Sequence, residues 1–270
     1  MSDGLIVAVY VVIDDVMRAL GHRSHPAAHL SDAEVLTVAV AAAKSFQNHH
    51  ERALRVLTGM GYLSGRLSVS RFNRRVHALA GWFRLIVEAL GAACAQGEAS
   101  LIDSRPLPVC RRVRARRCRK VRGAEYCGYC AAEREQVFGW RRHLVCTLAG
   151  VPVAFELLPA SRHDLTPVHE VTVGLAEGAG VCGDKASNSA KDEASILADT
   201  QVRLVPQRKV NLQPNLWADK LALRHQRQRV ETLNSQLEKM GLQRLPARTN
   251  SGFEIKVHAS VLALLCANAA

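Results

Sequence analysis

The chain has 270 residues and a mass of 29.5 kDa, enough for one large domain or for a medium domain with a small one. Hydrophobic residues make up 48% of the sequence and its mean hydropathy is near zero, which excludes bulk disorder. Lys and Arg number 36 against 24 Asp and Glu, and the resulting net charge of +12 is typical of proteins that bind a polyanion.

The apolar segment 5–13 near the start of the chain is too short to span a membrane, and Asp14 and Asp15 follow it directly. The first residues carry no basic segment of the kind that opens a secretory signal. We therefore expect no membrane partner and a cytoplasmic, nucleoid-associated protein. In that compartment the eight cysteines are expected to be thiols or metal ligands and not disulfides.

Residues 1–98 predict a group of helices. Segment 5–20 carries an apolar helical stripe. Ser31 and Glu34 have the spacing of a capping box and stand just before an apolar run, so a second helix is expected to begin there. A third helix is expected over 50–57.

A further helix is expected to begin after Ser68 or Ser70. On it Arg71, Arg74 and Arg75 fall on one face. A basic helix in a small helical region is compatible with helix-turn-helix DNA binding, while a solvated helix face is the alternative.

The positive charge is concentrated in residues 99–270, which hold 26 basic and 16 acidic residues. Within them, segment 110–122 has eight basic residues among thirteen and no acidic one. One interpretation is a solvated loop, and the other is an arm that orders on DNA, with counterion release supplying affinity. The arginines expected to contact phosphate are Arg111, Arg112, Arg114, Arg116, Arg117 and Arg119.

From residue 99 onward, short strand-like runs alternate with helical ones. Segments 137–148 and 151–158 flank Ala149-Gly150 and predict a hairpin. The later elements expected are a helix at 165–177, a strand at 180–183, a helix at 190–198, a strand at 202–205, and helices at 219–240 and 255–268. This alternation predicts an α/β domain over 99–270 with a mixed sheet.

Two acidic residues each follow a short apolar strand. Leu101-Ile102 predicts a strand that ends in Asp103, and the run 181–183 precedes Asp184. Open α/β sheets place their sites at the carboxyl ends of strands. Carboxylates that lie close together repel unless a cation separates them, and Mg²⁺ takes carboxylate oxygens while keeping waters for a phosphate substrate. Taken singly, an Asp after a strand is commonly a turn or cap residue.

A third carboxylate, Glu231, lies in the expected helix 219–240. Arg227 precedes it by four residues on the same helix face, where it can orient the carboxylate and reach a phosphate. An ordinary surface ion pair is the alternative interpretation.

Several stretches carry one family pattern. They are Leu-Ser-Asp-Ala-Glu-Val-Leu-Thr at 30–37, Ser-Arg-Phe-Asn-Arg-Arg at 70–75, Leu-Ile-Asp-Ser-Arg-Pro-Leu-Pro-Val-Cys at 101–110, segment 138–145, segment 159–164 and Gly-Asp-Lys at 183–185. In these the chain resembles bacterial insertion-sequence transposases of the DDE class, and most of all the nine-eight-two family.

The resemblance implies an α/β fold: an RNase H-like mixed sheet with flanking helices over 99–270, preceded by a small all-α, helix-turn-helix-like region over 1–98. It implies Asp103, Asp184 and Glu231 as the catalytic, metal-binding triad, with two Mg²⁺ or Mn²⁺ ions. The residues that would contact DNA phosphates near the triad are Arg227, Lys239 and Lys185.

The activity implied is metal-dependent cleavage of DNA at the ends of an insertion sequence, followed by strand transfer into target DNA. The partners implied are double-stranded DNA with the terminal inverted repeats and the target DNA. A homodimer or larger assembly on DNA is expected, because two element ends must be brought together.

The helix departs from the family motif of Tyr, two residues, Arg, three residues, Glu, six residues and Lys. Arg227 and Glu231 match it, but Arg224 takes the tyrosine position and Glu238 the lysine position, with Lys239 one residue later. These departures keep the triad and alter residues that would position the substrate. The alternative function is therefore a non-catalytic DNA-binding protein derived from a decayed transposase, and a third is a general nuclease of the same fold.

Cysteine and histidine patterns offer two weaker alternatives. Cys127 and Cys130 form one close pair, but seven residues separate the preceding two cysteines, so zinc is not expected. His143 and His163 leave open a nuclease with one metal and a histidine. Asp164 is expected to cap the helix that follows it.

Overall fold

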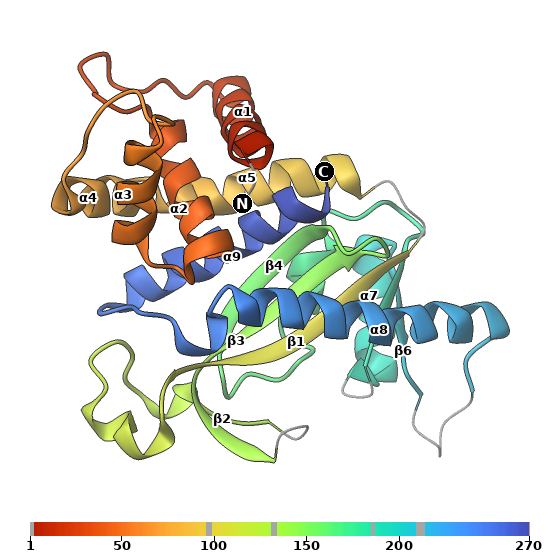
Figure 1. The fold of residues 1–270 in the computed structure, drawn as a ribbon. Helices are drawn as coiled ribbons and strands as arrows, with labels where there is room; N and C mark the ends of the chain where they lie inside the picture. The colour runs from red at the N-terminus through yellow and green to blue at the C-terminus, as the bar shows by residue number, and fades with distance from the viewer. Residues whose placement is uncertain (1–2, 96–98, 131–133, 185–186, 209–213, 270) are drawn as a thin grey trace. The chain divides into compact units, whose positions relative to one another are not determined.

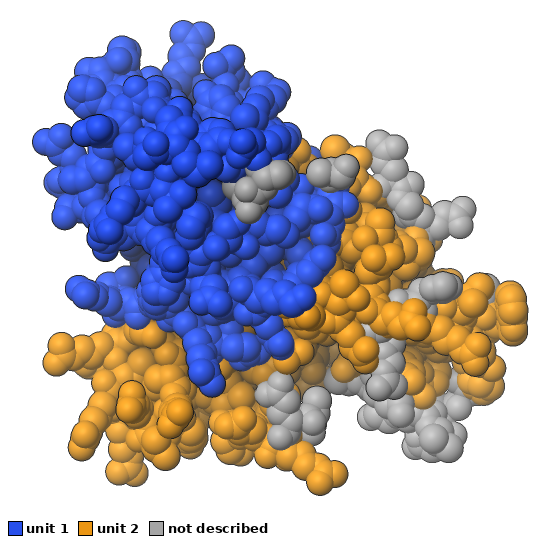
Figure 2. Space-filling model, in the orientation of Figure 1, with its two compact units in different colours: residues 1–89, 236–270 blue, residues 90–235 orange. Residues whose placement is uncertain are grey.

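The computed structural model describes residues 3–95, 99–130, 134–184, 187–208 and 214–269 (Figure 1). Contacts divide the chain into two compact units, Met1–Ala89 with Gln236–Ala270 (unit 1) and Leu90–Ser235 (unit 2), which Figure 2 colours separately. The sequence predicted one boundary near residue 98. The contacts differ from that division mainly at the carboxyl end, because they group 236–270 with the helices of the first part of the chain.

Unit 1 is helical, as predicted for this part of the chain. Its helices are α1 (Asp3–Ala19), α2 (Asp32–Phe46), α3 (His50–Gly59), α4 (Val69–Ala78), most of α5 (Ala80–Cys94) and α9 (Asn250–Asn268), with a short 3₁₀ helix η4 (Leu242–Arg244). The α2 helix is buried continuously from Ala33 to Ala43, and α9 is buried along nearly all of 253–265. These two helices pack on each other. A helix buried on all sides belongs in the centre of a core, so α2 and α9 form the centre of unit 1.

The predicted capping box at the start of α2 is confirmed. Ser31 Oγ accepts a hydrogen bond from the Glu34 amide at 3.1 Å, and the Glu34 carboxylate accepts one from the Ser31 amide at 2.6 Å. The same carboxylate accepts bonds from the amide and hydroxyl of Ser64, at 2.6 and 2.9 Å. Glu34 therefore satisfies donors at the helix start and also ties down the segment before α4.

The α4 and α5 helices follow one another with only Leu79 between them. Ser68 caps α4, which settles the choice that the sequence left open. Within the described residues, no single helix has both the length and the hydrophobicity to cross a membrane. The pair α4 and α5, bent by 54°, passes that test together by length and composition only.

A buried amide connects the end of α2 to the carboxyl-terminal segment. Asn48 Nδ2 donates to the carbonyl of Met240 at 2.9 Å and to Ser260 Oγ at 3.0 Å. Asn48 has a φ of 64°, in the left-handed region that Asn tolerates better than most residues. The Asn48 side chain therefore joins two parts of unit 1 that are almost 200 residues apart in the sequence.

Replacing Asn48 with Gly should lower the free energy of unfolding by about 1–3 kcal/mol, because a buried carbonyl loses its donor while Gly accepts the left-handed backbone. Gln47→Gly is the matched control, since Gln47 is exposed and also has a positive φ of 49°. Urea unfolding measures both variants. Equal stability of the two would contradict the assigned role of Asn48.

Unit 2 is built on a mixed sheet. Its strands are β1 (Ala99–Cys110), β2 (Cys127–Cys130), β3 (Glu135–Thr147), β4 (Pro152–Pro159), β5 (Gly180–Gly183) and β6 (Arg203–Pro206). The order is β2-β3-β1-β5-β6, with β4 also paired to β3. Strands β2, β3 and β4 form antiparallel pairs, and β5 and β6 run parallel to β1. The predicted hairpin is β3–β4, and the architecture agrees with an RNase H-like mixed sheet flanked by helices.

The first strand is longer than predicted. The sequence predicted that it ends at Asp103, but β1 continues to Cys110 because β3 pairs with it along this whole length. Strand β5 pairs only with Ala99–Leu101, so the other edge of β1 is open beyond that point. Pro106 and Pro108 have no N–H to donate, and both residues face the same side of the strand. Because that side is the unpaired edge of β1, no hydrogen bond between strands is lost.

The helices of unit 2 cover the two faces of the sheet. They are α6 (Val168–Thr172), α7 (Ala190–Thr200) and most of α8 (Trp217–Lys239). The α6 helix is much shorter than the predicted 165–177. On one face α6 and α7 pack onto a cluster that contains Ile102, Val145 and Val181. On the other face Leu223 of α8 packs onto Leu101, Cys182 and Val205.

Candidate active site

Asp103 lies within β1, directly opposite Leu144 of β3. Its side chain shares a face of the sheet with Leu101, because residues two apart in a strand point to the same side. Its Oδ2 atom accepts hydrogen bonds from Arg142 Nη2 at 3.1 Å and from Asn234 Nδ2 at 3.2 Å. The side chain is 23% exposed, so the carboxylate is both anchored and accessible from solvent.

Asp184 directly follows β5, the parallel neighbour of β1. Leu101 of β1 pairs with Cys182 of the parallel strand β5. Asp103 and Asp184 each follow their member of this pair by two residues. The two acids therefore occupy equivalent places on neighbouring strands, although Asp103 lies inside its strand and not at the carboxyl end where the sequence predicted it. Asp184 is exposed, and its main-chain carbonyl and Oδ1 accept hydrogen bonds from the amide and hydroxyl of Ser187 at 3.2 and 3.4 Å.

Glu231 is an exposed residue of α8, the helix on the Asp103 face of the sheet. Asn234, which contacts Asp103, follows it by three residues. Residues three apart are neighbours on a helix surface, so Glu231 lies within one turn of the contact to Asp103.

The three acids do not converge on a single point. Within the described part of the chain, no three His, Cys, Asp or Glu side chains form a group that could hold a metal ion. The chemistry of the donor set does fit a hard divalent cation, since Mg²⁺ and Mn²⁺ take carboxylate oxygens. The assignment of Asp103, Asp184 and Glu231 as ligands stays a prediction.

Arg142 and Asn234 were not singled out from the sequence. The Arg142 side chain is 1% exposed, and its Nη2 also donates to Asn234 Oδ1 at 2.7 Å. Burial lowers the pKa of Arg142, and the Asp103 carboxylate opposes that shift. One available signal was a charged residue within the apolar run 137–148, because a buried charge requires a partner.

His143 does not support the histidine-nuclease alternative. It pairs opposite Ser104, so it lies on the sheet face away from Asp103. The residue is 0% exposed, and neither ring nitrogen has a hydrogen-bond partner among the described residues. Burial lowers the pKa of His143 to about 4, which leaves the ring neutral near pH 7.

Asp164 has a different role from the predicted helix cap. Its Oδ1 accepts hydrogen bonds from Ser104 Oγ at 2.6 Å and Arg141 Nη1 at 2.8 Å, and α6 begins without a side-chain cap. His163, the other histidine considered, lines a cleft of about 470 Å³ beside α6 and α7. The three candidate acids are not among the residues that line this cleft.

Three residues near the triad are predicted to contact DNA phosphates, and the structure describes the side chain of one of them. Lys185 and the side chain of Arg227 lie outside the described residues. Lys239 is exposed at the end of α8.

A family model described as the transposase DDE domain matches residues 93–244, more than half of the chain. The chain belongs to the transposase DDE domain family. Comparison with curated proteins and with solved structures gave no match. The matched range contains all three candidate acids, as well as Arg142 and Asn234. It supports a transposase and leaves the nine-eight-two family as a prediction.

The arginine-rich segment 110–122 of the transposase, here called the basic arm, includes the 3₁₀ helix η1 (Arg112–Arg117). Val121 is buried near one end, and Lys120 Nζ donates to the carbonyl of Val109 at 3.1 Å, which closes the base of the arm. All the arginines predicted to contact phosphate in the arm are exposed, namely Arg111, Arg112, Arg114, Arg116, Arg117 and Arg119. The arm thus presents its charge to solvent from a fixed base.

All eight cysteines of the transposase lie in described residues, and none of them forms a disulfide. Cys146 and Cys182 are buried core residues, whereas Cys94 and Cys266 are only partly buried. Burial and the neighbouring Cys118 thiol raise the pKa of Cys110 at the base of the basic arm.

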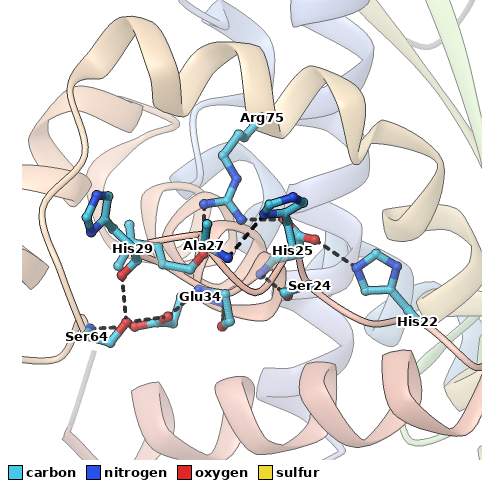
Figure 3. Close-up of polar contacts among 11 residues, drawn as sticks. His22, Ser24, His25, Ala27, His29, Glu34, Ser64 and Arg75 are labelled. Atoms are coloured by element: carbon cyan, nitrogen blue, oxygen red, sulfur yellow. Dashed lines mark hydrogen bonds and ion pairs between the residues drawn. The ribbon is translucent and has the colours of Figure 1, made fainter.

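The three arginines of α4 differ in their surroundings. Arg71 and Arg74 are exposed, but Arg75 donates to the carbonyl of Leu30 at 2.8 Å and forms an ion pair with Asp32 (Figure 3). His22 Nε2 lies 2.9 Å from the same carboxylate. Burial raises the pKa of Asp32, but the hydrogen bonds from Arg75 and His22 outweigh it and hold that pKa below its usual value. Arg75 therefore braces unit 1 internally, and the exposed basic face is reduced to Arg71 and Arg74.

Arg75→Met should lower the free energy of unfolding by about 1–3 kcal/mol, because the Asp32 carboxylate and a main-chain carbonyl lose their donor. Arg74→Met, the matched control on the same helix, should change stability by less than about 0.5 kcal/mol and weaken DNA binding. Thermal unfolding and a fluorescence anisotropy titration with duplex DNA separate the two effects. Weaker DNA binding by Arg75→Met at unchanged stability would contradict this assignment.

Proposed function

We propose that the protein is a metal-dependent transposase that cuts DNA at the ends of an insertion sequence and joins those ends to target DNA. Its membership of the transposase DDE domain family carries the proposal. The register of the sheet supports it, because Asp103 and Asp184 occupy equivalent positions on neighbouring parallel strands.

In this proposal Asp103, Asp184 and Glu231 hold Mg²⁺ or Mn²⁺. When bound, a pair of such ions lowers the barrier to phosphodiester cleavage by activating the nucleophile and stabilising the leaving oxygen. The chain's own contribution is to supply three carboxylates from two strands and a facing helix. The Arg142 guanidinium and the Asn234 amide anchor the first of them.

The DNA-binding surfaces proposed are the basic arm and the exposed arginines of α4. Double-stranded DNA with terminal inverted repeats and the target DNA are the proposed partners. A homodimer or larger assembly on DNA would bring two element ends together.

Asp103→Asn, Asp184→Asn and Glu231→Gln should each lower the rate of strand cleavage by at least about a thousandfold, because each removes a charged oxygen ligand from the divalent-ion site. Binding to DNA should stay within about twofold, since none of these residues belongs to the basic arm. The assay uses duplexes carrying candidate terminal repeats with Mg²⁺ or Mn²⁺, resolved on denaturing gels.

Asp199→Asn, at an exposed acid of α7 outside the family motif, is the control and should cut at the normal rate. A variant of the triad that still cuts would remove that residue from the proposed set.

Replacing Arg112, Arg114, Arg116 and Arg117 with Ser should weaken duplex binding and flatten its salt dependence. Each lost phosphate contact lowers the slope of log K against log salt by about 0.9, so the slope should fall by about 3–4. Replacing Arg18 and Arg55 with Ser is the control, because these arginines pair with acids one turn away on their own helices. An unchanged slope in the arm variant would show that the arm does not contact phosphates.

A non-catalytic DNA-binding protein derived from a transposase is the second candidate. Two observations favour it: the three carboxylates do not converge into a metal-binding group, and Arg224 and Glu238 depart from the family motif. Sequence-specific binding with no cleavage at any Mg²⁺ or Mn²⁺ concentration would support this candidate over the enzyme.

A further inference from the structure

Three polar side chains from three elements meet on the sheet face that α8 covers. Arg142 of β3 donates to Asp103 Oδ2 at 3.1 Å and to Asn234 Oδ1 at 2.7 Å. Asn234 of α8 donates in turn to Asp103 Oδ2 at 3.2 Å. Each of the three side chains thus contacts both of the others, and together they link β1, β3 and α8.

The register of β1 and β3 explains this meeting. Asp103 is opposite Leu144 and Arg105 is opposite Arg142, so Arg142 is a diagonal neighbour of Asp103 on the same face. Diagonal neighbours on a sheet are within reach of long side chains. The guanidinium can therefore approach Asp103 without leaving the interior of the unit.

Burial of Arg142 and Asn234 carries a cost in free energy, because both side chains lose their contact with water. Arg142 is 1% exposed and Asn234 is 7% exposed. Removing a guanidinium from water carries a large desolvation penalty, and an apolar side chain of similar volume often stabilises such a position as well or better. Packing of the sheet would therefore be satisfied by an apolar side chain at position 142. A guanidinium at this position is needed only to orient the Asp103 carboxylate.

Both hydrogen bonds to Asp103 fall on one oxygen. With Oδ2 engaged by two donors, the carboxylate plane is fixed by partners on β3 and α8. The Oδ1 atom is then the oxygen that a cation can take without displacing either donor. Polar neighbours of a metal ligand commonly act in this way, by fixing its orientation.

We propose that Arg142 and Asn234 are positioning residues that orient Asp103 for a divalent cation. Asn234 also seats α8 against the sheet, which sets the place of Glu231 one turn earlier. This inference rests on the proposed function, because it assigns to Asp103 the role of a metal ligand.

The test measures Mn²⁺ binding directly on the full-length protein without DNA, from the electron paramagnetic resonance signal of free Mn²⁺. Asn234→Leu keeps the approximate shape of the side chain and removes both of its hydrogen bonds. It should weaken Mn²⁺ binding by about 10–100-fold, the usual effect of losing a partner of a metal ligand. Its cleavage rate should recover partly as Mn²⁺ is raised, and its DNA affinity should not change.

A purely structural role predicts a different result. Asn48→Gly in unit 1 is the matched control, since it also removes a buried amide and should leave Mn²⁺ affinity unchanged. If Asn234→Leu lowers the unfolding temperature but binds Mn²⁺ as the unmodified protein does, the positioning role is overturned.

Arg142 is tested by a conservative substitution, because Arg142→Met would remove the charge beside Asp103 and can prevent folding. Arg142→Lys keeps the charge but not the planar donor pair, so it should fold and lose Mn²⁺ affinity by about tenfold. Normal Mn²⁺ affinity in Arg142→Lys would remove Arg142 from the proposal.

Asp103→Asn distinguishes a failure of the proposed metal site from a failure of the positioning role of Arg142 and Asn234. Loss of Mn²⁺ binding in Asp103→Asn together with normal binding in Asn234→Leu would overturn only the positioning role. Normal Mn²⁺ binding in Asp103→Asn, or no binding by the unmodified protein, would overturn the proposed metal site and this inference with it.

Discussion

A long antiparallel pairing joins β1 to β3, from Ser100 opposite Thr147 to Cys110 opposite Phe138. Because strand residues alternate between faces, this one register determines which side chains share a surface. Asp103 and Arg142 fall on the face toward α8, and Ser104 and His143 fall on the other. A slip of one residue would separate the acid from its guanidinium and bury His143 beside the candidate site.

The transposase uses arginine in two opposite environments. In the basic arm the guanidinium groups are exposed, where they keep their hydration and can exchange counterions for DNA phosphates. Arg75 and Arg142 are instead drawn inward and paired with Asp32 and Asp103. The first environment suits reversible contact with a polyanion, whereas the second fixes a carboxylate in place. Net charge alone does not distinguish them, although both contribute to the total of +12.

Local signals in the sequence predicted much of the fold. The Ser31 capping box and the Ala149-Gly150 turn depend on a few adjacent residues, so they could be identified without tertiary information. The extension of β1 past Asp103 could not, because Pro106 and Pro108 are tolerated only on account of an open edge that the topology creates.

The candidate site shows the same limit. The position of Asp103 and Asp184 directly after apolar runs predicted that each would lie on or next to a strand, whereas the pairing of those two strands came from the structure. The inward turn of Arg75 and the burial of Arg142 depend on partners that are distant in sequence, Asp32 in one case and Asn234 in the other. Nothing in the spacing of residues along α8 indicated that Asn234 would reach Asp103.

The grouping of α9 with α2 has a consequence for how the molecule is made. The ribosome synthesises the helices of unit 1 first, then the whole of unit 2, and only afterwards the helix that completes the first core. Until then the side of α2 that α9 covers lacks its partner, so that surface stays exposed on the nascent chain or is bound by a chaperone. A chain truncated before α9 would lack one of the two central helices of unit 1, so the remaining helices of that unit could not form the same core.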